Sequence, residues 1–127
     1  MTAERLVIGV ALSARSWRGD LQRHCRDHEP DLAVVLLHQG AEALAGELDV
    51  LVVDDDTSWV SVPFVKAARE AGVAMIGMFD PAESDGFGRR QLEHHGIDTV
   101  LDCSVDSDTL VDAIRSLRRD PDLDGRF

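Results

Sequence analysis

Five short runs of apolar residues follow one another along the chain. They occupy residues 6–12, 32–37, 50–53, 73–79 and 99–101. The runs are rich in β-branched residues and lack the polar alternation of a half-exposed strand, which is typical of strands buried on both faces of a parallel sheet. The pattern therefore predicts a five-stranded parallel sheet with residues 50–53 in its interior.

The segments between these runs predict helices, because their apolar residues recur at intervals of three or four. The first segment has an apolar face that includes Trp17, and Ser13 or Ser16 is positioned to cap it. The fourth is expected to begin with a cap at Asp80 and to break at the glycines within residues 86–88. Strands that alternate with helices through short loops predict a doubly wound α/β fold with right-handed crossovers.

The composition is typical of one globular domain and does not favour a membrane-spanning or nucleic-acid-binding protein. The chain has 127 residues, 44% of them hydrophobic, and its apolar runs are far shorter than the ~20 residues needed to cross a bilayer. Its 24 acids against 13 lysines and arginines give a net charge of −11, which repels nucleic-acid phosphates. The first residues lack a signal-peptide layout, and Cys25 and Cys103 are expected to be reduced thiols. We therefore expect a cytoplasmic protein that binds neither nucleic acid nor membranes.

The central strand and its flanking acids resemble a known family. Asp49 opens this strand, and three aspartates at residues 54–56 follow it. Two further features match the same family: the segment 90–98 before the fifth strand, and the apolar face of the last helix, formed by Leu110, Ile114 and Leu117. Over residues 5–119 the chain resembles a receiver domain of the response-regulator superfamily.

The resemblance implies both a fold and a candidate site. The fold would be CheY-like (flavodoxin-like), a three-layer α/β/α arrangement with strand order 2-1-3-4-5. Residues 1–119 would form the receiver-like domain, and residues 120–127 a tail or truncated linker. In this family the aspartate that ends the third strand accepts a phosphoryl group, and Asp54 occupies that position.

Most of the partners that phosphoryl transfer needs in this family are missing. Receivers hold magnesium with acids at the end of the first strand, where residues 11–13 include no acid. Receivers place a hydroxyl after the fourth strand, where residues 78–80 have none. They place a lysine after the fifth strand, and the corresponding position in this chain lies near Cys103. Lys66 is the only lysine in the chain. Because such transfer depends on electrostatic stabilisation, the sequence predicts an atypical, or pseudo-, receiver that is not an enzyme and needs no cofactor.

Two stretches, 69–81 and 96–101, are similar to the receiver-like N-terminal domains of MinD/ParA-type ATPases, including those of Tad pilus assembly and septum-site proteins. The ATPase phosphate loop, Gly-x-x-x-x-Gly-Lys, does not occur in the chain, and such a domain would attach after Asp120. The similarity implies a non-catalytic signalling and protein-interaction module that localises or regulates an attached or partner ATPase.

An alternative is a true phosphoaccepting receiver that uses Asp54. Mg²⁺ would then be held by Asp54 with Asp55 or Asp80, since a cation relieves the repulsion between neighbouring carboxylates. Solvated acids without a bound metal are the other interpretation of this cluster. A small α/β enzyme or flavin carrier is a third class, but the sequence has no nucleophile and base at a recognisable spacing.

Receivers commonly pair through the surface formed by the fourth helix, the fifth strand and the fifth helix, which implies a homodimer or another protein partner. In this chain the predicted interaction face would combine basic and acidic side chains, which suits self-association. Its residues are Arg89, Arg90, Asp98, Asp112, Arg115 and Arg118.

Two other groups of residues have both a chemical and a structural interpretation. His24 and His28 stand four residues apart on one helix beside Cys25, the spacing of a two-histidine metal face, although imidazoles near a helix C-terminus also favour its dipole. Trp17 is expected to pack in the core. Trp59 follows the acids, where it would either cover the site as a lid or form part of a contact surface.

Overall fold

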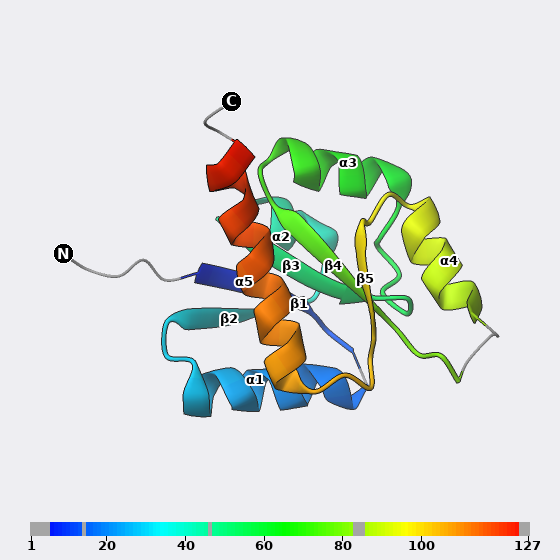
Figure 1. The fold of residues 1–127 in the computed structure, drawn as a ribbon. Helices are drawn as coiled ribbons and strands as arrows, with labels where there is room; N and C mark the ends of the chain where they lie inside the picture. The colour runs from blue at the N-terminus through cyan, green and yellow to red at the C-terminus, as the bar shows by residue number, and fades with distance from the viewer. Residues whose placement is uncertain (1–5, 14, 46, 83–85, 125–127) are drawn as a thin grey trace.

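The computed structural model describes residues 6–13, 15–45, 47–82 and 86–124, with side chains described as far as Leu117. In this part of the chain five strands alternate with five helices (Figure 1). The strands are β1 (Leu6–Ala11), β2 (Leu32–Leu37), β3 (Val50–Asp54), β4 (Ala74–Phe79) and β5 (Thr99–Asp102). The helices are α1 (Ser16–His28), α2 (Gly40–Ala45), α3 (Val62–Glu70), α4 (Phe87–His94) and α5 (Ser107–Asp124). None of these described helices is long and apolar enough to cross a membrane.

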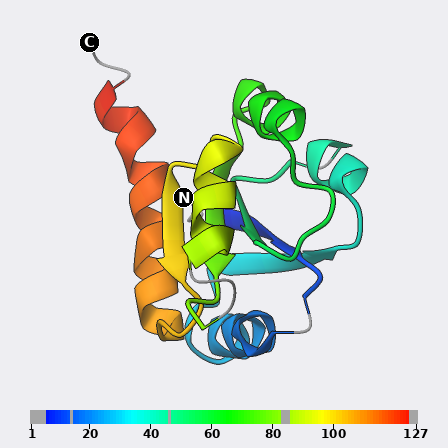
Figure 2. The same cartoon turned by 90° about the vertical axis from the view of Figure 1, so that its right-hand side faces the viewer.

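The described strands form one parallel sheet with β3 at its centre. The strand order is β2-β1-β3-β4-β5. Ile8 of β1 and Ala74 of β4 both pair with Val50 of β3. Helices α1 and α5 cover one face of the sheet, and α2, α3 and α4 cover the other (Figures 1 and 2). The predicted three-layer fold and its strand order are confirmed.

β3 contributes to both hydrophobic cores. Val50 and Val52 pack in the core beneath α1 and α5, whereas Leu51 and Val53 pack in the core beneath α2, α3 and α4. All four side chains are fully buried. A strand covered on both faces must be apolar at every position, which explains the missing polar alternation. The strand ends with Asp54 at the carboxyl edge of the sheet, where ligands of open α/β folds bind.

The start of α1 differs from the prediction. Arg15 occupies the N-cap position without a side-chain capping bond, and Ser16 is already the first helical residue. Neither Ser13 nor Ser16 therefore caps the helix. The physical reason is that the Ser13 hydroxyl donates to Asp54 and accepts the backbone N–H of Arg15 instead.

The start of α4 also differs, because the helix begins later than predicted. It starts at Phe87, after Gly86 with a left-handed φ of 84°. Asp80 Oδ1 accepts a backbone N–H two residues further on at 2.9 Å, which closes a turn instead of capping a helix. Gly88 lies inside the helix and does not interrupt it. Residues 83–85 of the predicted helix lie outside the described residues.

α5 extends to Asp124, into the segment that is predicted to be a tail or truncated linker. The predicted boundary after residue 119 therefore falls within a helix. The assignment of a receiver-like domain to residues 1–119 stays a prediction.

Cys25 gives a prediction for stability at alkaline pH. Its side chain is buried in the core beneath α1, and burial raises its pKa from 9.0 to about 11. The folded state thus holds this proton more tightly than the unfolded state, so the stability it contributes is lost as the pH rises from about 9 to about 11. We expect the midpoint of urea unfolding to fall over this range more steeply in the wild type than in Cys25→Ala. Equal slopes in the two proteins would refute this assignment.

Candidate functional site

Asp54 is buried, and its carboxylate accepts four hydrogen bonds from described residues; 1% of its surface is exposed. Ser13 Oγ and Trp17 Nε1 donate to Oδ2 at 2.5 and 3.0 Å. The backbone N–H of Asp56 and the hydroxyl of Thr57 donate to Oδ1 at 3.0 and 3.1 Å. Each oxygen has two donors, as a buried carboxylate requires.

Neighbouring elements of the fold position these donors. β1 lies beside β3, so the loop after β1 brings Ser13 to the same edge as Asp54. Trp17, in the first turn of α1, buries its ring in the core and directs its indole N–H to that edge. Thr57 is held in a turn, since its backbone N–H donates to the Asp54 carbonyl and its hydroxyl accepts the Asp54 N–H, both at 3.0 Å. The predicted burial of Trp17 is confirmed, and its bond to Asp54 is an unpredicted addition.

A guanidinium group lies beside the acids. Arg15 Nη1 donates to Asp55 Oδ1 and lies 3.7 Å from Asp54 Oδ2. The side chains of Arg15 and Asp55 are only 17% and 9% exposed, so solvent screens this pair weakly. The loop between β1 and α1 therefore supplies a positive charge at this edge of the sheet, although the chain has no lysine beyond Lys66.

Asp55 also contacts the start of α4. A Cβ atom built on Gly88 would lie 1.8 Å from Asp55 Oδ2, so glycine is what allows the carboxylate to approach the helix. A negative charge at a helix N-terminus is favoured by the unpaired N–H groups and the helix dipole. Asp55 thus joins the loop after β1, through Arg15, to the first turn of α4.

The three candidate magnesium ligands are engaged by groups of the protein. Asp54 accepts four hydrogen bonds, Asp55 pairs with Arg15, and Asp80 accepts a backbone N–H in its own turn. In the part of the chain that the structure describes, one group of three histidine or acidic ligand atoms lies within 4.8 Å of one another. That group is His24, Glu29 and Asp108, and it lies elsewhere in the fold.

A pocket of about 160 Å³ lies between the loop after β3 and α4, and its lining includes Asp56, Ser58 and His95. Small-molecule sites usually occupy roughly 300–1,000 Å³. The room beside the acids is therefore small for an organic molecule.

Four of the six residues of the predicted interaction face are exposed. Arg89 and Arg90 on α4, Asp98 before β5 and Asp112 on α5 are all exposed. Arg89 pairs with Glu93 of the same helix at 3.3 Å, and a surface ion pair of this kind stabilises little. The face therefore presents charged side chains of both signs to solvent.

Arg115, on α5, contacts the loop between α1 and β2. Its guanidinium donates to Glu29 Oε1 at 2.6 Å and to Asp31 Oδ2 at 2.8 Å. These carboxylates raise the pKa of Arg115 above its ordinary value. Arg118 lies beyond the last described side chain. The structure thus places Arg115 in an intramolecular ion pair.

Trp59 packs between α2 and α3 instead of covering the acids. Its ring meets Phe64 edge-on with centroids 5.1 Å apart, and a Cβ on Gly40 would lie 3.1 Å from it. The side chain is half-buried. Neither the predicted lid nor a freely exposed contact surface describes this position.

Comparisons with known proteins show the fold but no close relative. No family model matches the chain, and no curated protein matches it. The signal receiver domain described as that of NarL from Mycobacterium tuberculosis has a TM-score of 0.72 and 18% identity, over 92% of this chain and 98% of that one. The REC domain of AraT, a response regulator from Geobacillus stearothermophilus, has a TM-score of 0.67 and 20% identity, over 94% and 98%.

A third neighbour has a different description. It belongs to a family described as redox sensors in the streptococci that evolved from two-component response regulators. Its TM-score is 0.72 with 15% identity, and the match covers 95% of this chain but 54% of that one. Identities this low carry information about architecture only. The chain has the fold of response-regulator receiver domains.

Proposed function

We propose that this chain is a receiver-like signalling and protein-interaction module in which Asp54 is a structural residue instead of a phosphoacceptor. The observation that carries the proposal is the state of the Asp54 carboxylate, which is 1% exposed and has two donors on each oxygen. An attacking oxygen must reach phosphorus roughly in line with the leaving group. Asp54 would have to break hydrogen bonds and leave its buried position to do so.

Arg15 supports the same proposal. A guanidinium is permanently charged and matches the geometry of carboxylates, so Arg15 offsets the charge of Asp54 and Asp55 without a metal ion. The streptococcal neighbour is described as belonging to redox sensors that evolved from response regulators, so this fold has a precedent for another role.

The proposal predicts that the protein does not become phosphorylated. Incubation with Mg²⁺ and a small phosphodonor such as acetyl phosphate is expected to leave the intact mass unchanged, because Asp54 is engaged on both oxygens. Intact mass spectrometry is the measurement. The opposite result would be a labile gain of one phosphoryl group that is retained in Asp56→Asn and lost in Asp54→Asn, with folding of both variants checked by circular dichroism.

The second candidate, a phosphoaccepting receiver, is favoured by the position of Asp54 at the end of β3 in a receiver fold. It would require Ser13, Arg15 and Trp17 to release the acids, so that Mg²⁺ could bind Asp54 with Asp55 or Asp80. The mass measurement described above separates the two functions, since only the second gives an adduct.

We further propose that the partner is a MinD/ParA-type ATPase, attached or separate, on the similarity of residues 69–81 and 96–101 to the receiver-like domains of such proteins. The test adds the chain to a MinD/ParA-type ATPase encoded in the same reading frame or beside it. A change in the rate of ATP hydrolysis that saturates with added chain is expected. Unchanged hydrolysis, together with no co-sedimentation, would discard this partner.

Self-association through α4, β5 and α5 is the remaining part of the proposal. Because Arg115 is engaged with Glu29 and Asp31, the informative substitutions are Arg89→Glu and Arg90→Glu, which lie exposed on α4. We expect the double variant to sediment as a monomer under conditions where the wild type is a dimer, since reversing charge makes like charges meet across the interface. Exposed arginines on α1, altered as Arg23→Glu and Arg26→Glu, are the matched control. A wild type that sediments as a monomer would end the dimer hypothesis, and a double variant that still sediments as a dimer would exclude this face as the interface.

A further inference from the structure

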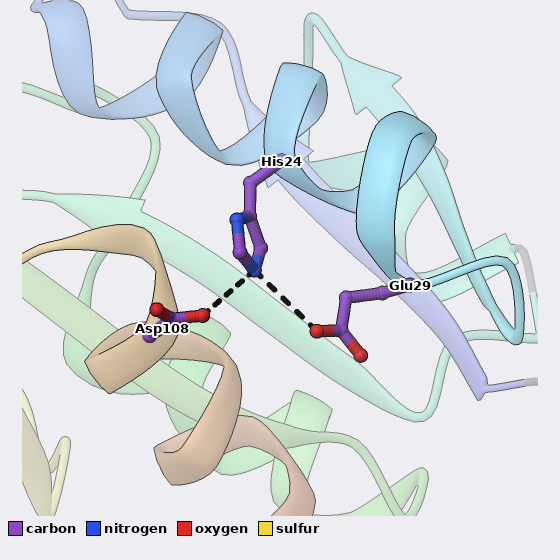
Figure 3. Close-up of side chains that lie close together, drawn as sticks. All are labelled: His24, Glu29 and Asp108. Carbon is purple, nitrogen blue, oxygen red and sulfur yellow. Dashed lines mark ion pairs between the residues drawn. The ribbon is translucent and has the colours of Figure 1, made fainter.

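His24, Glu29 and Asp108 converge from two helices that are distant in sequence. His24 lies on α1, Glu29 directly follows that helix, and Asp108 lies in the first turn of α5. Figure 3 shows the imidazole of His24 directed between the two carboxylates. His24 Nε2 lies 3.1 Å from Asp108 Oδ1 and 3.4 Å from Glu29 Oε2.

These separations suit a tetrahedral metal ion. Ligand atoms about 2.0–2.1 Å from a tetrahedral zinc ion lie roughly 3.3–3.4 Å from each other, and one imidazole with two carboxylates is a normal zinc ligand set. The two separations from Nε2 fall close to this value, and all three ligand atoms lie within 4.8 Å of one another. We propose that His24, Glu29 and Asp108 form a binding site for Zn²⁺ that joins α1 to α5.

The surroundings of His24 Nε2 agree with this assignment. Its Nε2 atom is buried from solvent and makes no hydrogen bond within the described part of the chain, despite the two nearby carboxylates. Two carboxylate oxygens at 3.1 and 3.4 Å from a neutral imidazole nitrogen leave negative charge uncompensated, so the arrangement calls for a cation there, either a proton on Nε2 or a bound metal ion. The cluster borders solvent through Asp108, whose side chain is 79% exposed.

Neighbouring side chains hold the ligands in place. Arg115 donates to Glu29 Oε1 at 2.6 Å, while the other oxygen of Glu29 faces His24. Hydrogen bonds of this kind orient a ligating carboxylate and are a regular part of metal sites.

The proposed ligand set differs from the His24 and His28 pair that the sequence spacing indicates. Cys25 is buried in the core, and His28 lies beside His24 with ring centroids 5.1 Å apart.

The proposed ion is zinc rather than magnesium, for reasons of ligand chemistry. Mg²⁺ prefers six oxygen ligands in an octahedron, whereas an imidazole nitrogen suits zinc. Three protein ligands would leave one position of a tetrahedral ion open to water or to a ligand from another molecule. This site is independent of Asp54 and of the proposed function.

The test is calorimetric titration of Zn²⁺ into the chelator-treated 127-residue chain, with and without millimolar Mg²⁺. One ion is expected to bind per chain, and Mg²⁺ should not compete. His24→Gln and Asp108→Asn are each expected to weaken binding by at least about tenfold, since even second-shell changes cost about 10–100-fold. The side chain of Asp108 is 79% exposed, so Asp108→Asn should keep the fold. This variant therefore tests zinc binding even if His24→Gln does not fold.

Matched controls are His94→Gln on α4 and Asp98→Asn, whose carboxylate is 92% exposed. Both should bind Zn²⁺ within about twofold of the wild type because neither contacts the site. Zn²⁺ should also raise the thermal unfolding midpoint of the wild type, and this increase should disappear in Asp108→Asn. Absence of binding, unchanged binding in Asp108→Asn, or an equal loss in the controls would each overturn the proposal.

Discussion

Replacing Asp54 with alanine is expected to lower the free energy of unfolding by about 3–5 kcal/mol, the range seen when one member of a buried charge pair is removed. The substitution would leave the indole N–H of Trp17 and the hydroxyls of Ser13 and Thr57 without their acceptor. Each buried group that loses its partner costs about 1–3 kcal/mol. The Arg15 guanidinium would also lose one of the carboxylates near it.

The sign of this effect tests whether the Asp54 carboxylate stabilises the fold. In a pocket where unpaired carboxylates await a cation, the acids repel one another, and removing one of them relieves repulsion and stabilises the fold. In this chain Asp54 is surrounded by donors and a guanidinium, so its removal should destabilise instead. A carboxylate held by donors and a carboxylate crowded by other acids thus give opposite changes in stability when they are removed.

Urea unfolding followed by circular dichroism is the measurement, with Asp56→Ala as the control. Asp56 is exposed, and substitutions at such positions usually change stability by less than about 0.5 kcal/mol. The stability of Asp54→Asn should fall between those of the wild type and Asp54→Ala. Its amide keeps one acceptor oxygen but presents N–H groups to the remaining donors. Wild-type or greater stability for Asp54→Ala would show that the carboxylate is not the centre of a stabilising network.

The sheet could be predicted because its signal is local. Each strand is a continuous apolar run that can be recognised without knowing its neighbours, and β3 is apolar at every position from Val50 to Val53 because both faces are covered. The starts of α1 and α4 could not be placed as well. There, serine and aspartate side chains choose between a helix cap and other partners, and that choice depends on distant parts of the fold.

The position of Asp54 at the sheet edge was also predictable, whereas its partners were not. Ser13, Arg15 and Trp17 come from a segment about forty residues earlier, and one sequence does not give their directions. The strand order implied by the sequence does indicate which segment supplies these partners. β1 and β3 are adjacent in the implied strand order, so polar residues after β1 must lie near Asp54. A basic residue can therefore reach this edge from the loop after β1, as Arg15 does, as well as from the end of β5.

Gly88 shows how one residue type can have two explanations. In a helix interior, glycine weakens the helix by about 0.5–1 kcal/mol relative to alanine, so the sequence alone indicates a break. The structure gives the other explanation, since the absence of a side chain lets Asp55 approach the first turn of α4. This contact connects the acids to the helix that carries Arg89 and Arg90 of the predicted interaction face.

Gly88→Ala tests whether that connection holds α4 in place. The new methyl group would lie 1.8 Å from Asp55 Oδ2, so the carboxylate or the helix must move. Overpacking of this kind costs about 1–3 kcal/mol, which exceeds the gain of about 0.5–1 kcal/mol from the helix preference of alanine. We therefore expect a net loss of unfolding free energy, measured by urea titration.

The matched control is Gly19→Ala in the interior of α1, where a Cβ would meet nothing within 4 Å. There only the helix preference acts, so stability should rise by about 0.5–1 kcal/mol. The double variant Asp55→Ala, Gly88→Ala removes the clashing carboxylate, and its loss should be smaller than the sum of the two single losses. If the two losses simply add, Asp55 does not bear on α4, and the acids at the end of β3 have no direct mechanical link to the predicted interaction face.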